Sequence, residues 1–279
     1  MNSRGSVLII ALTLMMLLTS LVGGFLYAAG LFVLNSGWAE TDTKAFWLTE
    51  AGLQKGIWYL KTPSGSGGQG EDWPSSGTQT LTESLGGGSY TMVVERWDFA
   101  LSSNSSTASS NSSAGGAPPS NAIDNNSATY WESGANPSNS DPQDLIITFP
   151  YALTINKVQF ISPSTGSSAR DYAVAVSSDG SSYTTVSSGT NDNSATKLQT
   201  FTAQSNVRYL RLRVTEDGTG APNRVRISTF EAIGSKITST GTITVSGSNY
   251  SRTVSQTVVT DDASPQSQVA YCQPDWAEQ

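Results

Sequence analysis

Hydrophobic and polar positions divide the chain into one long helical segment followed by many short strands. No Asp, Glu, Lys or Arg occurs from position 6 to position 34, a run longer than the roughly 20 apolar residues that cross a bilayer. Beyond it Phe46, Leu53, Ile57 and Leu60 recur near one helical face, so an amphipathic helix is predicted to continue to about residue 61. The apolar run is too long for a removable signal peptide, and we expect it to remain as an anchor.

Alternating apolar and polar positions predict two groups of strands after the helix. Pro63–Gly70 is rich in Gly and Ser and should end the helix. Ser89–Val94, Ile237–Val245 and Tyr250–Val259 are predicted to share one antiparallel sheet. Between the pieces of that sheet, regularly spaced short strands indicate an all-β sandwich: Leu145–Phe149, Ile155–Ile161, Tyr172–Val176, Tyr183–Val186, Val207–Val214 and Arg226–Ile233.

The stretch that leads into the predicted sandwich has a different composition. Leu101–Ser120 is almost entirely Ser, Asn, Gly, Ala and Pro. Such a segment cannot bury enough apolar surface to fold by itself. It is therefore predicted to be a linker into an inserted domain.

Composition excludes several classes of function. The net charge is −7 with only 13% charged residues, so the chain has no basic surface to attract nucleic acid. There is no histidine, which excludes Ser-His-Asp and Cys-His catalysis and the commonest zinc ligand. The acidic residues of the predicted sandwich are scattered rather than paired as in a glycosidase, and the single Cys272 has no partner for a disulfide. We expect a protein that is not an enzyme.

Two N-terminal segments resemble the PilX-like minor type IV pilins. They are Arg4–Ala11 (RGSVLIIA) and, more specifically, Ala45–Leu53 (AFWLTEAGL). The resemblance implies a prepilin leader cut between Gly5 and Ser6 by a prepilin peptidase that methylates Ser6, and packing of the helix against other pilins or pseudopilins. Ile10 stands where major pilins carry a glutamate, which fits a tip-proximal minor subunit.

Three further segments resemble the discoidin, or coagulation factor V/VIII type C, family. They are Asn121–Trp131, Tyr172–Gly180 and Val207–Leu212, in matching order and spacing. The family is a galactose-binding-like jelly-roll sandwich, common in modules that bind carbohydrates or lipid headgroups at cell surfaces. The resemblance implies such a module inserted into a pilin domain.

Candidate site residues follow from this second resemblance. The family holds Ca²⁺ at the loop that begins at Asp124, and Asp, Asn and Thr supply the hard oxygens that the ion prefers; a turn closed by its own hydrogen bonds is the alternative. The predicted metal ligands are Asp124, Asn126, Thr129 and Glu231. Arginine donors and aromatic rings suit sugars, which makes Arg170, Tyr183 and Arg224 the predicted ligand contacts, with Tyr130 as a further candidate.

The sequence thus predicts an α+β pilin, a long N-terminal helix plus an antiparallel sheet, with an inserted all-β jelly-roll sandwich. Positive Arg4 before the apolar run and acidic Glu40 after it predict a cytoplasmic N-terminus. The pilin resemblance implies a bacterial inner membrane as the location before transfer to a pilus or cell surface. The expected function is adhesion through glycans of a cell or matrix; a surface lectin outside any fibre and a ligand-free spacer are the alternatives. The predicted segments are 1–5 leader, 6–61 helix, 62–100 loop and strand, 101–117 linker, 118–234 sandwich, 235–262 closing strands and 263–279 tail.

Overall fold

The computed structural model describes residues 3–70, 73–74, 77–218, 223–245 and 247–258, and in 3–12 and 32–36 it describes the backbone but not the side chains. The predicted tail and Cys272 lie outside the described residues. By their contacts the residues form two compact units. We call Met1–Gly52, Thr82–Thr91 and Thr240–Thr253 the helical unit, and the rest the module unit.

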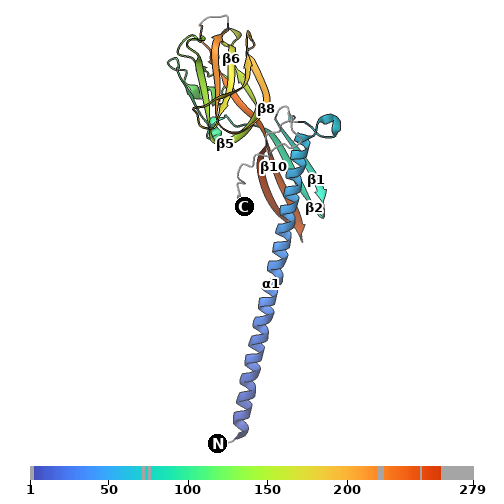
Figure 1. Ribbon diagram of the computed structural model, residues 1–279. Helices are drawn as coiled ribbons and strands as arrows, with labels where there is room; N and C mark the ends of the chain where they lie inside the picture. Colours follow the sequence, from blue (N-terminus) through green and yellow to red (C-terminus); the bar gives the residue numbers. More distant parts are fainter. Residues whose placement is uncertain (1–2, 71–72, 75–76, 219–222, 246, 259–279) are drawn as a thin grey trace. The chain divides into compact units, whose positions relative to one another are not determined.

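One long helix and eleven strands make up the described fold (Figure 1). Helix α1 (Ser3–Lys61) is continuous, as predicted for residues 6–61, and four short 3-10 helices follow it: Ser64–Ser66, Ser102–Asn104, Pro119–Ile123 and Thr165–Ser167. The strands are β1 (Thr78–Leu85), β2 (Gly88–Asp98), β3 (Thr107–Ser110), β4 (Trp131–Glu132), β5 (Gln143–Ile161), β6 (Ala169–Ser177), β7 (Thr184–Gly189), β8 (Thr196–Asp217), β9 (Arg226–Ile227), β10 (Thr229–Val245) and β11 (Ser248–Val258).

Nine of these strands form one sheet in the order β1-β2-β10-β5-β8-β6-β7, with β11 paired to β10 and β3 paired to β5. The prediction that Ser89–Val94, Ile237–Val245 and Tyr250–Val259 share a sheet is confirmed, because β10 pairs with both β2 and β11. Strands β4 and β9 form a separate two-stranded sheet.

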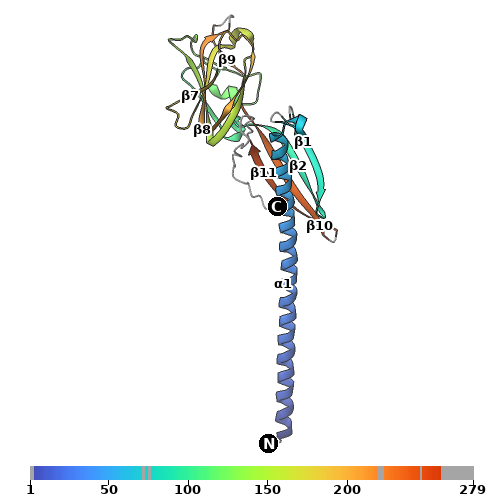
Figure 2. The same ribbon diagram turned by 45° about the vertical axis from the view of Figure 1, so that its right-hand side comes forward.

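An antiparallel sandwich with one core fills most of the module unit (Figure 2). The two strands predicted at 145–149 and 155–161 are a single strand, β5, whose register with β8 shifts between Thr148 and Lys157. Such irregularities bend a strand without ending it. The alternation expected for β8 is confirmed, since Leu210, Leu212 and Val214 are fully buried. Phe160 stacks on Phe230 at a centroid distance of 5.9 Å within the same core.

The predicted linker is partly wrong, because residues 107–110 form strand β3 and pair antiparallel with β5. Hydrogen bonds hold this segment, and Ala108 packs against the core. The Ser106 hydroxyl donates to the Phe99 carbonyl at 2.7 Å, and Asn111 Nδ2 donates to the Pro142 carbonyl at 2.8 Å. Small polar residues suffice here because an adjacent strand satisfies the backbone.

Within the helical unit, the Thr49 hydroxyl joins α1 to two strands. Its oxygen lies 2.9 Å from the carbonyl oxygens of both Ala45 and Arg252, which share its one proton, and it accepts the Gly241 N–H at 3.0 Å. A Cβ at Gly241 would lie 2.3 Å from the Ala45 carbonyl oxygen, so only glycine allows β10 to approach the helix this closely. Asp42 of α1 also pairs with Arg252 through two hydrogen bonds of 2.6 and 2.8 Å.

Within the module unit, Asp98 ties together the strands by which the chain enters and leaves the sandwich. Its Oδ1 accepts the N–H of Ala100 at 2.8 Å and that of Ala232 at 2.9 Å. Burial raises the pKa of the Asp98 carboxyl to about 7; the two N–H donors oppose this shift, Glu231 adds to it and Arg96 opposes it.

The raised pKa of Asp98 predicts a pH-dependent stability. The unfolded group titrates near 3.8, so between about 4 and 7 the folded protein holds a proton that the unfolded chain releases. The free energy of unfolding should therefore fall as pH rises through this window, by up to about 1.4 kcal/mol per pH unit. Asp98→Asn keeps the Oδ1 acceptor and should flatten the dependence, measured by denaturant unfolding of the detergent-solubilised chain from pH 4 to 8. The exposed Asp141→Asn is the control, and equal slopes for wild type and Asp98→Asn would contradict the assignment.

Candidate functional site

The loop after the 3-10 helix Pro119–Ile123 gathers oxygen atoms around Asp124. Asp124 Oδ1 accepts the Asn126 N–H at 2.9 Å, and Oδ2 accepts the Thr129 hydroxyl at 2.7 Å. That hydroxyl also lies 2.8 Å from the Asn126 carbonyl oxygen. Asn125 takes the left-handed conformation, φ 61°, which Asn tolerates better than most residues. Three of the four predicted metal ligands therefore converge.

The fourth predicted ligand, Glu231, has a different partner. It lies on β10 opposite Gln159, and its carboxylate forms an ion pair with Arg96 of β2. Alternation along β10 directs the Glu231 side chain toward β2, which is remote in sequence. The position of Glu231 in the sequence does not predict this partner. Across the described ranges no three or more Asp, Glu, Cys or His side chains cluster as metal ligands.

The donor set at Asp124 is of the kind that suits Ca²⁺. A carboxylate, a backbone carbonyl and a hydroxyl are hard oxygens, and Ca²⁺ takes six to eight of them in flexible geometry. Asp124, Asn126 and Thr129 would hold the ion, which would supply positive charge that draws the loop together. The same contacts also describe a turn closed by its own hydrogen bonds.

A cluster of charged and aromatic side chains lies on the outer face of the β4–β9 pair. In the register Trp131 opposes Ile227 and Glu132 opposes Arg226. Trp131 and Ile227 are fully buried in the core. Strand alternation therefore turns Glu132 and Arg226 to the opposite face.

Glu132 is the centre of this cluster. Its Oε2 accepts a hydrogen bond from Arg226 Nε at 2.6 Å, and its Oε1 accepts one from Arg224 Nη1 at 3.2 Å. The Arg226 guanidinium lies 4.8 Å from the centroid of the Tyr130 ring. We call Tyr130, Glu132, Arg224 and Arg226 the Glu132 cluster.

The Glu132 cluster carries one excess positive charge, and its two guanidinium groups have more N–H donors than Glu132 uses. Each guanidinium has five N–H donors, and Glu132 takes one donor from each arginine. The Arg224 side chain is 38% exposed, whereas that of Glu132 is 11% exposed. A buried carboxylate thus orients two partly exposed cations beside an aromatic ring, an arrangement that can bind hydroxyl groups or an anion.

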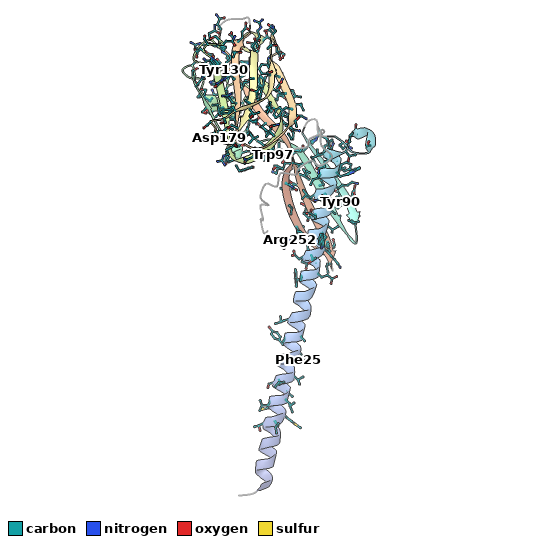
Figure 3. All side chains as sticks on the ribbon, viewed as in Figure 1. Phe25, Tyr90, Trp97, Tyr130, Asp179 and Arg252 are labelled. Atoms are coloured by element: carbon teal, nitrogen blue, oxygen red, sulfur yellow. The ribbon has the colours of Figure 1, made fainter. Side chains whose placement is uncertain are left out.

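The Asp124 loop positions the aromatic member of the cluster. Thr129 directly precedes Tyr130, and Asn121 Nδ2 donates to the Tyr130 carbonyl at 3.1 Å. Figure 3 shows Tyr130 in the half of the module opposite Trp97, which lies on β2 where the chain enters the sandwich. The cluster therefore lies away from the strands that hold the module.

The structure does not join the three predicted ligand residues into one site. Arg224 belongs to the Glu132 cluster. Arg170 donates instead to Glu216 at 2.6 Å and to Asn191. The Tyr183 ring lies 4.0 Å from the Arg211 guanidinium on the outer face of β8.

Sequence patterns did not single out two members of the Glu132 cluster, Glu132 and Arg226, as candidate site residues. A local signal exists, because each flanks a buried apolar residue in an alternating pair, Trp131-Glu132 and Arg226-Ile227. The pairing of two short strands nearly one hundred residues apart, however, has no local signature.

Comparison with known families supports an F5/8 type C domain in this chain. Residues 105–227 match the model of the F5/8 type C domain family. The match begins before the predicted sandwich boundary at residue 118 and includes β3. No curated protein sequence matched the chain.

Several solved structures are similar to the module. Chitosan-binding module 1 of a chitosanase/glucanase from Paenibacillus sp. IK-5 is 28% identical, with a TM-score of 0.42, over 49% of this chain and 98% of that one. The family 32 carbohydrate-binding module of C. perfringens NanJ, solved with galactose, is 21% identical, with a TM-score of 0.41, over 50% and 98%.

Proposed function

We propose that this chain is a membrane-anchored minor pilin-like protein whose F5/8 type C domain binds carbohydrate through the Glu132 cluster. Helix α1 contains an apolar stretch, Thr13–Leu31, of mean hydropathy 1.8 whose residues are exposed, and this supports the anchor. The family match over residues 105–227 supports a binding module rather than an enzyme. Adhesion to a cell or matrix surface would follow from combining the two.

The observation that carries the carbohydrate proposal is the convergence of unlike groups in the Glu132 cluster. Sugar hydroxyls both donate and accept hydrogen bonds, and the cluster offers guanidinium donors beside a carboxylate acceptor. The Tyr130 ring offers an apolar surface for the carbon-bound face of a sugar. Binding by one such site should be weak, because protein hydrogen bonds replace water hydrogen bonds at little net gain. Several copies would raise avidity.

Substitutions in the cluster should weaken glycan binding without unfolding the module. For the full chain in detergent, screened on a glycan array as monomer and as multimer, Tyr130→Ala and Arg224→Ala should each lower affinity at least about tenfold, or about 1.4 kcal/mol. Arg213→Ala is the matched control, since Arg213 is 39% exposed and pairs with Asp144, whose side chain is as buried as that of Glu132.

Two results of the glycan screen would contradict the proposal. If the multimer binds no glycan on the array, the ligand-free spacer is favoured. Binding that survives in both variants but is lost in Arg170→Ala or Tyr183→Ala would move the site to the other predicted contacts.

We further propose that Ca²⁺ occupies the Asp124 loop. A ligand that binds only the folded state raises stability by RT ln(1 + [L]/Kd). Millimolar Ca²⁺ should therefore raise the Tm of the wild-type chain relative to chelator, and Asp124→Ala should remove this response. Asp141→Ala, an exposed acid in another loop, should respond like wild type. An unchanged Tm in wild type would leave the closed turn as the correct description.

The pilin part of the proposal rests on the resemblance of Arg4–Ala11 and Ala45–Leu53, and on the role of Thr49 within the second segment. Thr49 forms hydrogen bonds with both β10 and β11. A threonine in this motif therefore helps to hold the helix on the sheet. The partners would be other pilins or pseudopilins and a prepilin peptidase.

Processing tests the pilin assignment directly. Intact-mass analysis of the native protein should give a chain that begins at methylated Ser6, shorter by the five-residue leader. An intact Met1 would favour a surface lectin on a single-span anchor. Immunogold labelling should find the processed protein at fibre tips, because Ile10 cannot supply the charged contact of a packed major subunit.

A further inference from the structure

The hairpin between β10 and β11 brings exposed apolar groups to the part of α1 that follows the apolar run. Trp38 of α1 meets Tyr250 of β11 edge to face, with ring centroids 4.9 Å apart and an interplanar angle of 83°. Trp38 is 57% exposed and Val245, at the end of β10, is 42% exposed. All three belong to the helical unit. We call them the hairpin tip.

The position of Trp38 along the helix matches the edge of a bilayer. The apolar stretch ends at Leu31, and the sequence stays apolar through Leu34. At 1.5 Å per residue, Trp38 lies about 10 Å beyond Leu31 and about 6 Å beyond Leu34. The headgroup layer on each side of the hydrocarbon core is roughly 5 to 7 Å thick. Helical side chains lean toward the N-terminus, which carries the Trp38 ring back toward that layer.

The hairpin tip has no charge that would oppose contact with lipid. Positions 244 to 251 contain no Asp, Glu, Lys or Arg. The next charges along α1 are already paired, Glu40 with Lys44 at 2.6 Å and Asp42 with Arg252 at 2.6 Å. Trp and Tyr are enriched at membrane interfaces because each ring has an apolar body and a polar group.

We propose that the hairpin tip is a docking surface for the lipid–water interface of a bilayer, so that Trp38, Val245 and Tyr250 lie among the lipid headgroups. This inference rests on the proposed membrane anchoring of α1. It adds a second, peripheral contact that holds the end of the sheet on the membrane. Because the local charges are paired, the contact should not require anionic lipid.

The sheet offers a second hairpin as an internal control. The β1–β2 hairpin includes Leu85, which is 53% exposed. A Cβ at Gly88 would lie 2.5 Å from Leu48 Cδ1, so this hairpin meets the helix near Leu48. Leu48 is about 20 Å beyond Leu34, well outside the headgroup layer. Figure 3 shows Phe25 on the N-terminal part of α1, within the apolar stretch.

Site-specific labelling of the full chain in liposomes tests the proposal. In a Cys272→Ser background, Ser248→Cys, Leu85→Cys and Phe25→Cys would each carry an environment-sensitive fluorophore. Vesicles of phosphatidylcholine, with and without phosphatidylglycerol, would contain lipid-borne quenchers at headgroup and acyl depths. We expect headgroup-depth quenching and a blue-shifted emission at position 248, acyl-depth quenching at position 25, and neither effect at position 85.

Substitutions then assign the effect to the two rings. Trp38→Ser with Tyr250→Ser should reduce quenching at position 248 at least threefold, whereas Trp38→Phe with Tyr250→Phe should retain most of it. Position 248 as water-exposed as position 85, with position 25 quenched, would overturn this inference and leave the anchor intact. No quenching at either 25 or 248 would overturn the anchor together with this inference. Quenching at 248 only in vesicles with phosphatidylglycerol would replace the neutral contact by an electrostatic one and overturn the proposal as stated.

Discussion

The sandwich depends on holding together the two chain passages that lead into and out of it. Asp98 accepts the N–H of Ala100 at the entry and that of Ala232 at the exit through a single carboxylate oxygen. The Phe99 N–H donates to the Ala232 carbonyl, and the ion pair of Arg96 with Glu231 crosses the same two strands. Closing a long insertion costs conformational entropy once, and that cost grows only slowly with length. A few hydrogen bonds and one ion pair between the entry and exit strands can therefore support a domain of more than one hundred residues.

Strand alternation explains how the module places the Glu132 cluster. The entry and exit strands lie at one end, and alternation along β4 and β9 buries Trp131 and Ile227 while it turns Glu132 and Arg226 to the opposite face. Tyr130 lies in the half of the module opposite Trp97 (Figure 3). The carboxylate that orients Arg224 and Arg226 is itself buried, so the fold holds the two guanidinium groups in place.

In the helical unit, one glycine and one hydroxyl group set the distance between α1 and the sheet. Gly241 lets β10 approach α1, and Thr49 converts that approach into hydrogen bonds with two strands. Because a helix places its side chains at fixed heights, this contact also determines where the hairpin tip lies along α1. The proposed contact with lipid is therefore a consequence of how closely the sheet packs on the helix.

The sequence by itself determined the periodic features of this protein. Local patterns account for the long apolar run, the alternation in β8 and the regularly spaced strands. Asp124, Asn126 and Thr129 lie within six consecutive residues, so a single turn is enough to bring them together. Tertiary structure alone decided the rest. Residues 107–110 became a strand because β5 offered backbone partners, Glu231 turned to Arg96, and Glu132 met Arg226 across nearly one hundred residues. The physical reason is that hydrogen bonds and ion pairs across strands depend on register, and register depends on pairing between distant segments that no local period records.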